Sequence, residues 1–288
     1  MAKVLIQKGT FNMKKTILLT GATDGIGLET AKMLLAQGHT VLLHGRNQDK
    51  LNTVQASLNA DYPQASTATY IADLSDMAQV NTLAQSVLAD LQNANKILDV
   101  VINNAGVYKL ANITTVDGLD ARFAVNTLAP YLLTKALLPV MNTQSRVVNV
   151  SSAAQTSVNF DSLVGNKPLS DSAAYAQSKL AITMWSRHLG LELKDTGPIV
   201  VSVNPKSLLG SKMVKDAYGI DGGDLKIGAD IFCRAALSDE FKDAAGLYFD
   251  NDTGRFAPPH VDALNNAKNQ QLVDTLDSIL AQLKLGKA

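Results

Sequence analysis

Short runs of apolar residues alternate with longer amphipathic segments along most of the chain. The runs are typical of buried strands, and the longer segments repeat their apolar positions at helical spacing. The pattern predicts strands near 16–20, 40–44, 67–71, 97–102, 145–151, 199–204 and 246–249. It predicts helices near 25–37, 47–59, 76–92, 117–140, 172–194, 224–237 and 262–284. This alternation favours an α/β fold in which helices cover both faces of a parallel sheet.

We find no break in composition and no repeat that would divide the chain. Residues 1–12 precede the first predicted strand and are taken as an N-terminal extension, and residues 13–288 as a single domain. The N-terminus lacks the long apolar region of a secretory signal, and we expect no membrane-spanning run. A cytoplasmic protein is therefore expected.

Charge and cysteine content narrow the classes of partner. The 288 residues carry 26 Lys and Arg against 26 Asp and Glu, so no net field attracts nucleic acid or an acidic membrane. The lone Cys233 excludes an intrachain disulfide and a cysteine metal cluster. The four histidines are scattered without the spacing of metal ligands. We therefore predict no metal site and no nucleic-acid partner.

A glycine-rich turn joins the first predicted strand to the first predicted helix. Glycines permit a tight turn and close backbone approach, and a helix N-terminus offers free N–H groups to a pyrophosphate. The spacing is G-x-x-x-G-x-G, which differs from the G-x-G-x-x-G of long-chain dehydrogenases. The pattern predicts a Rossmann-type, doubly wound dinucleotide-binding fold, with a plain strand-to-helix turn as the alternative. The turn consists of Thr20, Gly21, Ala22, Thr23, Asp24, Gly25, Ile26 and Gly27.

Tyr175 and Lys179 lie four residues apart, and on a helix this spacing puts them on one face. A neighbouring positive charge favours the phenolate, and we expect it to lower the tyrosine pKa from about 10 towards working pH. Such a group can pass a proton to a carbonyl oxygen or take one from an alcohol. The spacing alone is not specific, because Y-x-x-x-K also occurs by chance on helix surfaces.

Six motifs stand in an order that resembles the short-chain dehydrogenase/reductase family over most of residues 16–205. They are the glycine turn, Asp73-Leu74, Asn103-Asn104-Ala105-Gly106, Asn126, Val148-Asn149-Val150-Ser151-Ser152, and Tyr175 with Lys179. Two further segments, Asp117-Gly118-Leu119 and residues 42–47, resemble the retinol-dehydrogenase-like branch. The resemblance implies an oxidoreductase that interconverts a carbonyl and an alcohol by hydride transfer. The alternative is a regulatory or scaffold protein that binds the dinucleotide without turnover.

The resemblance implies a catalytic tetrad. Tyr175 is the general acid/base, and Lys179 lowers its pKa and holds the nicotinamide ribose. Ser152 hydrogen-bonds the reacting oxygen, with Ser151 as the alternative within the pair. Asn126 holds a water in the proton relay, or is a packing residue of its helix.

The end of the second strand favours NADP(H) as the cofactor. No acidic residue stands there to bind ribose hydroxyls, whereas Arg46 supplies a planar donor fork for a 2′-phosphate. A solvated surface arginine is the alternative. By resemblance, Asp73 contacts the adenine beside the Leu74 backbone, although Asp73 is also a candidate helix N-cap. The remaining implied cofactor contacts are Thr20, Gly21, Thr23, Asp24, Gly25, Ile26, Gly27, Asn47, Asn103, Ala105, Gly106, Tyr175, Lys179 and Pro205.

Two departures from the family pattern concern the surroundings of the site. Ser152 and Tyr175 are 23 positions apart, well beyond the usual dozen or so, and Lys206 replaces the usual glycine after Pro205. Glycine allows backbone conformations that lysine adopts only at a cost. Loops 153–172 and 206–223 are expected to shape a site for an uncharged aldehyde, ketone or alcohol of moderate size. By resemblance, the long helices at 117–140 and 172–194 form a homodimer or homotetramer.

Overall fold

The computed structural model describes residues 14–285, so the N-terminal extension predicted at 1–12 lies outside the described residues. The strands are β1 (Thr16–Leu19), β2 (Thr40–Gly45), β3 (Ser66–Ile71), β4 (Val100–Asn103), β5 (Arg146–Val150), β6 (Ile199–Asn204), β7 (Tyr248–Asp250) and β8 (Arg255–Phe256). The helices are α1 (Gly25–Ala36), α2 (Gln48–Asp61), α3 (Met77–Asn93), α4 (Ala121–Phe123), α5 (Ala129–Leu137), α6 (Phe160–Leu163), α7 (Asp171–Glu192), α8 (Lys212–Tyr218), α9 (Leu225–Leu237) and α10 (Asn266–Gln282).

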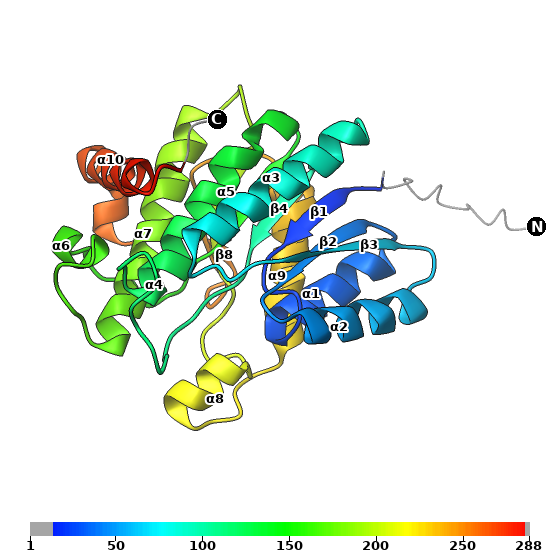
Figure 1. Ribbon diagram of the computed structural model, residues 1–288, viewed down its shortest axis with the longest axis horizontal. Coiled ribbons are helices and arrows are strands. Elements are labelled where there is room, and N and C mark those ends of the chain that lie inside the picture. The colour runs from blue at the N-terminus through cyan, green and yellow to red at the C-terminus, as the bar shows by residue number, and fades with distance from the viewer. Residues whose placement is uncertain (1–13, 286–288) are drawn as a thin grey trace, which may run out of the picture.

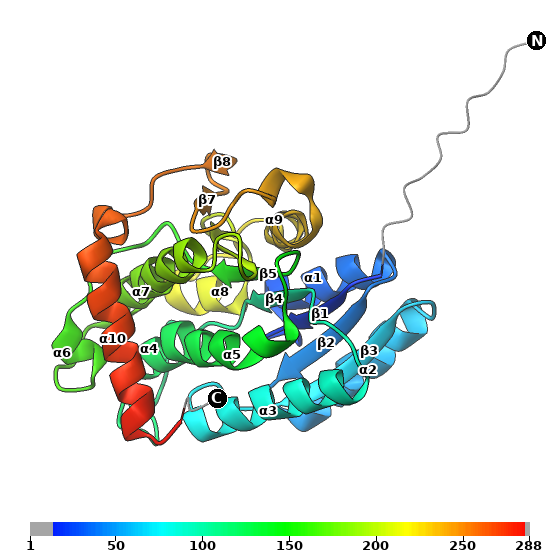
Figure 2. The same ribbon diagram turned by 90° about the horizontal axis from the view of Figure 1, so that it is seen from above.

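One eight-stranded sheet runs through the middle of the protein in the order β3-β2-β1-β4-β5-β6-β7-β8 (Figure 1). Every neighbouring pair is parallel except β7 with β8. Figure 2 shows α9 and α3 on opposite sides of this sheet. Strand order reverses at β1, which pairs with both β2 and β4. In such sheets the ligand crevice lies at the carboxyl ends of the strands beside this switch point.

The core is divided by the sheet into two apolar clusters. One contains residues of α1, α2 and α9, and the other contains residues of α3, α5, α7 and α10. The central strands β2, β1, β4, β5 and β6 are largely apolar on both faces because both faces are covered, which is why they read as apolar runs in the sequence. The predicted α/β class, with a doubly wound parallel sheet and helices on both faces, is confirmed.

Element boundaries differ from the prediction where the apolar pattern continues past a change of backbone. The helix predicted over 117–140 begins only at Ala121, because Asp120 pairs with Thr114 in a β-bridge and caps the helix. It also contains a π-helical turn over Ala124–Leu128 and ends in a 3₁₀ turn over Leu138–Val140. The helix predicted at 262–284 divides into a 3₁₀ turn, Val261–Leu264, and α10.

Three short elements were not predicted, namely α6, α8 and β8. Helix α8 has no buried residue and β8 has two residues, so neither leaves an apolar period in the sequence. Helices α6 and α8 lie within the loops predicted to shape the substrate site.

The segment Ala121–Val140 is long and apolar enough to cross a membrane by length and composition, a feature that the sequence analysis did not anticipate. In the structure, 78% of its most apolar window is buried inside the protein. Helix α5 within it packs against α3 and α7. Core packing therefore accounts for its composition.

Candidate active site

The glycine turn lies at the carboxyl end of β1 and is held closed by its neighbours. Gly21 and Gly25 have φ of +67° and +53°, a region that favours glycine. A Cβ on Gly27 would lie 2.1 Å from the Gly21 carbonyl oxygen, so no side chain fits there. The Asn104 side chain donates to the carbonyls of Thr20 (2.8 Å) and Gly21 (3.2 Å). Asn104 belongs to a motif in the sequence but was not predicted as a site residue.

His44 hydrogen-bonds to the same turn, and the sequence analysis did not identify it as a site residue. The Gly21 N–H donates to His44 Nδ1 at 3.3 Å, and His44 Nε2 lies 3.1 Å from the Ala72 carbonyl oxygen. Burial lowers the pKa of His44 to about 4, so the ring is neutral at pH 7 and its Nδ1 can accept. This ring connects the glycine turn to the segment that carries Asp73.

The tip of β2 presents Arg46 to solvent. Within residues 14–285, no hydrogen bond or ion pair engages its guanidinium, so it can bind an anion. Asn47 has a structural role, because its side chain accepts from Lys50 N at 2.8 Å and caps α2. The Lys50 ammonium in turn pairs with Asp24 at 2.6 Å and holds the pKa of that carboxyl below its usual range.

Asp73 is not the N-cap of the following helix. That position belongs to Asp76, which accepts from Ala78 N and Gln79 N. Asp73 Oδ1 accepts from both the backbone N and the hydroxyl of Ser75. Asp73 thus stands outside the helix at the end of β3, with buried Leu74 next to it.

Some residues of the Asn103–Gly106 segment lie in the core, and others lie at the site. Asn103 is buried, and its side chain donates to Asn149 at 2.7 Å, so this side chain lies in the interior rather than in the crevice. Ala105 N donates to Thr20 Oγ1 at 3.1 Å beside the glycine turn. A Cβ on Gly106 would lie 3.6 Å from Lys179 Nζ, so Gly106 faces the predicted catalytic group.

Tyr175, in the first turns of α7, lies beside Ser152 at the end of β5, whose side chain is close enough to lower the pKa of the phenol. The neighbouring Ser151 is buried, and its hydroxyl is bonded to Thr183 Oγ1 (2.7 Å) and to the Lys179 carbonyl (3.1 Å). Of the two serines, the structure therefore directs Ser152 towards Tyr175. Although Ser152 and Tyr175 are 23 positions apart in the sequence, the fold brings their side chains together.

The electrostatic effect of Lys179 differs from the prediction. Burial raises the pKa of Tyr175 to about 12, and the contact with Ser152 only partly opposes this. Burial lowers the pKa of Lys179 to about 8, while its ammonium donates to the Val150 carbonyl at 2.7 Å. The four-residue spacing correctly placed Tyr175 and Lys179 on one face of the helix. In this structure, however, burial has a larger effect on the two pKa values than the attraction between the groups.

Asn126 lies in the π-helical turn with its side chain fully engaged. Its amide accepts from Val107 N and donates to Val107 O, both at 2.9 Å, and also donates to Ser178 Oγ at 3.0 Å. The side chain therefore joins the segment after β4 to helix α7. Of the two roles considered for Asn126, this geometry supports packing by the side chain.

Arg122 anchors the start of α7 and was not singled out in the sequence. Its guanidinium is fully buried and makes a fork with Asp120, Nε to Oδ1 at 2.8 Å and Nη2 to Oδ2 at 2.6 Å. It also pairs with Asp171, the first residue of α7. Because Tyr175 lies one turn further along α7, this ion-pair group fixes the helix end that carries the predicted acid/base after the long loop.

Lys206 adopts φ of +110°, well outside the usual range for a residue with a side chain. The surrounding loop holds it there, since Asp252 accepts from the backbone and hydroxyl of Ser207 and Asn251 donates to the Pro205 carbonyl at 3.0 Å. The departure from glycine that the sequence showed therefore has a conformational cost.

Lys206→Gly is expected to raise the free energy of unfolding by about 1 kcal/mol, since strained non-glycine backbone costs about 1–3 kcal/mol and glycine's own entropy offsets part of the gain. Urea unfolding measures this. Asp195→Gly is the control, because Asp195 has φ of +71°, close to the left-handed region that Asp tolerates, and should gain less. An unchanged or lower stability for Lys206→Gly would contradict the assignment of strain.

Helix α10 packs across α7 and α5, the pair of helices predicted to form the oligomer interface (Figure 2). Its apolar side is buried, and Asp277 binds the Tyr131 hydroxyl (2.8 Å) and the Lys135 ammonium (2.7 Å) of α5. The homodimer or homotetramer stays a prediction, and α10 leaves less of these helices available for it.

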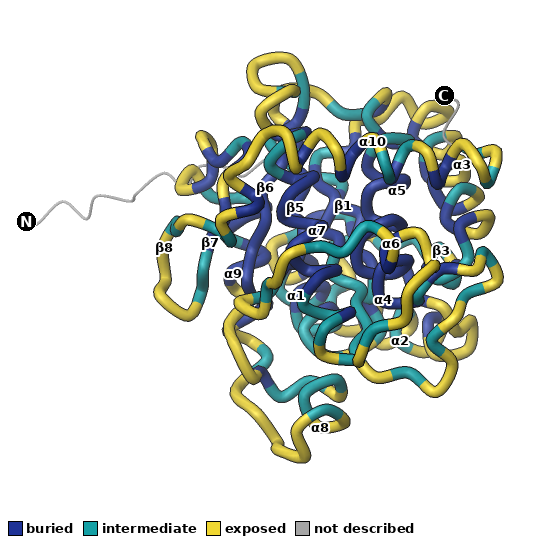
Figure 3. Tube along the Cα trace, turned by 90° about the vertical axis from the view of Figure 1, so that its left-hand side faces the viewer, coloured by how far each residue is buried: buried dark blue, intermediate teal, exposed yellow. Residues whose placement is uncertain are grey.

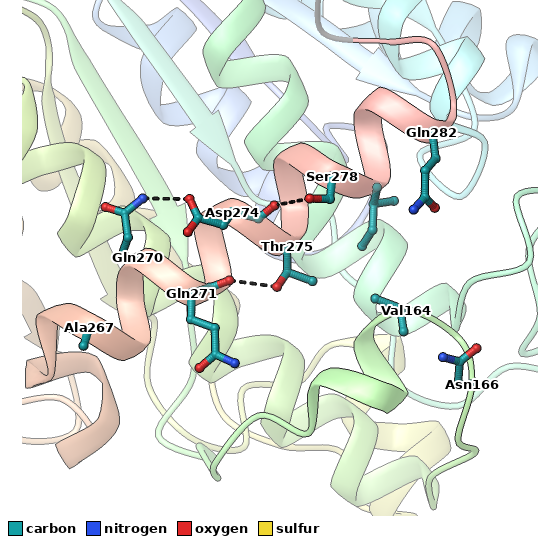
Figure 4. Close-up of a pocket in the computed structure, with 10 residues that line it drawn as sticks. Val164, Asn166, Ala267, Gln270, Gln271, Asp274, Thr275, Ser278 and Gln282 are labelled. Carbon is teal, nitrogen blue, oxygen red and sulfur yellow. Dashed lines mark hydrogen bonds between the residues drawn. The ribbon is translucent and has the colours of Figure 1, made fainter.

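A groove of about 680 Å³ runs along α10 beside Val164 and Asn166 (Figure 4). Three of its polar side chains bond within the helix, namely Gln270 to Asp274, Thr275 to the Gln271 carbonyl and Ser278 to the Asp274 carbonyl. None of the predicted site residues lines it. The predicted site is instead the crevice at the carboxyl ends of the strands.

A glycine turn and a neighbouring Tyr–Ser pair lie at the carboxyl ends of the strands, an arrangement typical of oxidoreductases of the Rossmann type. A family model described as short chain dehydrogenase matches residues 15–218. The chain belongs to this family, in its retinol-dehydrogenase-like branch.

Individual relatives agree with this placement. The chain is 32% identical to retinol dehydrogenase 12 of Bos taurus over 271 residues, which cover 90% of this chain and 84% of the relative. A crystal structure of an uncharacterized protein from Mycobacterium Paratuberculosis is similar at a TM-score of 0.75 and 25% identity, covering 94% of both chains. A short chain dehydrogenase from Escherichia coli CFT073 complexed with NADPH is similar at a TM-score of 0.66 and 26% identity, covering 84% of this chain and 99% of that one.

Proposed function

We propose that this protein interconverts an aldehyde or ketone and an alcohol with NADP(H), using Tyr175 as the general acid/base. The observation that carries the proposal is that Tyr175 lies beside both the Ser152 side chain and the Lys179 ammonium, whose Nζ is 5.7 Å from the centre of the Tyr175 ring. These three groups come from two elements whose ends meet where the fold forms its ligand crevice.

The residues present fit a dinucleotide. The positive φ of Gly21 and Gly25 opens the turn before α1, and the contact at Gly27 packs this turn closely. Arg46 at the tip of β2 has room and a free guanidinium for a 2′-phosphate, and no acidic residue competes at Gly45 or Asn47. The NADPH complex of the similar Escherichia coli protein supports the same choice of cofactor.

We assign the proton transfer to Tyr175, Ser152 and Lys179. A phenol with a pKa of about 12 carries its proton at pH 7, so Tyr175 is ready to donate to a carbonyl oxygen. The Tyr175 O–H bond breaks as the substrate O–H bond forms, while Ser152 holds the reacting oxygen. Lys179, with a pKa of about 8, is mostly charged at pH 7 and stabilises the phenolate that remains. When bound, NADPH supplies the hydride.

A panel of aldehydes, ketones and alcohols tests this proposal by the change in nicotinamide absorbance. We expect turnover of uncharged carbonyl compounds with NADPH. Tight NADPH binding without turnover across the panel would instead support the non-catalytic dinucleotide-binding protein.

Arg46→Ala tests the cofactor assignment. A charge-assisted hydrogen bond contributes about 1.5–3 kcal/mol, so we expect the NADPH dissociation constant to rise by about one to two powers of ten. The NADH constant should stay nearly unchanged and serves as the internal control at fixed salt. We prefer this single variant to adding an acidic residue at Gly45, because a Cβ there would lie 2.8 Å from Thr23 Cγ2 and would clash with it. Equal loss for both cofactors would contradict a phosphate contact.

A further inference from the structure

Two tyrosines that the sequence analysis did not select stand next to Tyr175. The Tyr108 ring meets the Tyr175 ring edge to face, with centroids 5.0 Å apart. The Tyr218 ring lies 6.2 Å from Tyr108 at an interplanar angle of 41°. Tyr108 follows the motif after β4, whereas Tyr218 ends α8, so two distant segments supply aromatic surface beside the acid/base.

Helix α8 lies close to the site along its length. Met213 Cε would be 3.8 Å from a Cβ on Gly106, and Ser211, the N-cap of α8, approaches Gly25 of the glycine turn. The helix therefore runs from the glycine turn towards Tyr175. Figure 3 shows α8 as an exposed and half-exposed segment set apart from the buried body.

Several apolar side chains in and beside α8 stay partly exposed within the described residues, next to charged ones such as Lys215 and Asp221. Tyr218 is 58% exposed, and Leu208 and Ile220 on either side of the helix are 49% and 41% exposed. Exposed apolar groups gathered beside a reaction centre are typical of a ligand-binding surface. Tyr108 packs on the Tyr175 ring and Tyr218 lies next to Tyr108, so these two rings connect the surface to the proposed acid/base.

Of the neighbouring side chains, Tyr218 acts most strongly on the pKa of the Tyr108 phenol. Burial and the neighbouring Tyr218 raise the pKa of Tyr108, so this phenol stays neutral at working pH. The pair can therefore contact a substrate through its aromatic rings. Aromatic rings prefer offset-stacked or edge-to-face partners, and such pairs contribute beyond the area they bury.

We propose that Tyr108 and Tyr218 select substrates whose carbonyl is attached to a flat aromatic ring, by packing that ring while Tyr175 and Ser152 hold the carbonyl oxygen. This inference rests on the proposed function and adds the substrate class. It assigns the two tyrosines to substrate specificity and leaves the proton transfer to Tyr175.

Acetophenone and cyclohexyl methyl ketone test the inference, because they share the methyl ketone and the carbon count and differ in whether the ring is flat. The quantity to compare is the ratio of their kcat/KM values with NADPH. Tyr218→Leu and Tyr108→Leu each remove one ring, whereas Tyr218→Phe keeps the ring and removes the hydroxyl. Comparing ratios between variants cancels the intrinsic reactivity of each ketone.

We expect the ratio of acetophenone to cyclohexyl methyl ketone to fall about threefold to tenfold in each Leu variant, the range for loss of one aromatic pair. It should stay near the wild-type value in Tyr218→Phe. An unchanged ratio in both Leu variants, or an equal fall in Tyr218→Phe, would overturn the proposal. So would a wild-type protein that reduces other carbonyls but not acetophenone.

Calorimetric binding of the two ketones to Tyr175→Phe with NADP⁺ separates this inference from the proposed function. The same preference for the flat ring, lost in Tyr175→Phe/Tyr218→Leu, would support the aromatic site even if no substrate were turned over. Equal binding of the two ketones would overturn the aromatic site even in a working carbonyl reductase.

Discussion

Tyr175→Phe is expected to retain NADPH binding and to lose at least about a hundredfold in turnover, the usual scale of general acid/base assistance. The substitution removes the phenol hydroxyl beside Ser152 and keeps the ring that packs against Tyr108. Loss of the proton donor should therefore lower kcat, whereas cofactor affinity should stay close to that of the wild type.

Steady-state kinetics and an NADPH dissociation constant on the same preparations measure the two effects. Tyr62→Phe is the matched control, because it deletes the same atom at the end of α2, on the opposite side of the sheet from α7. Near-normal turnover in Tyr175→Phe would reject Tyr175 as the acid/base.

Arg122→Gln should lower the free energy of unfolding by about 3 kcal/mol, towards the lower end of the range for breaking a buried ion pair. The side chain of Arg122 is fully buried, whereas Asp120 and Asp171 are 13% and 42% exposed, so the stranded carboxylates regain some water. Arg122→Lys should recover only part of the loss, because an ammonium cannot reproduce the fork to Asp120.

Urea unfolding of both variants measures this, with Arg234→Gln as the control. Arg234 also binds two carboxylates, Asp230 and Glu240, but all three side chains are partly exposed. Exposed pairs contribute about 0–1 kcal/mol, so this control should change little. Equal losses for Arg122→Gln and Arg234→Gln would contradict the anchoring role of Arg122.

The sequence predicted the sheet well because its strands are buried on both faces. β1, β2 and β5 appear as short apolar runs, and the observed bounds differ from the predicted ones by at most one residue at either end. Helix α8 could not be predicted in this way, since it buries none of its residues. The π-helical turn around Asn126 was likewise hidden, because its residues are as apolar and buried as an ordinary core helix.

At the site, sequence motifs identified individual groups but not their partners. The adjacent serines Ser151 and Ser152 look alike in sequence and differ only in the neighbours that the fold gives them. Arg122 meets Asp171 across 49 positions, a pairing that no local spacing shows. The pKa of Tyr175 depends on how much water the fold removes, which the four-residue spacing to Lys179 does not report.

The packing of α10 across α5 and α7 has a consequence for protein synthesis. Helices α5 and α7 leave the ribosome well before α10, so the growing chain carries an uncovered apolar surface on α5 and on α7, the helix of Tyr175 and Lys179. Such surfaces make nascent chains prone to aggregation. We therefore expect this surface to be at its most prone to aggregation before α10 has been translated.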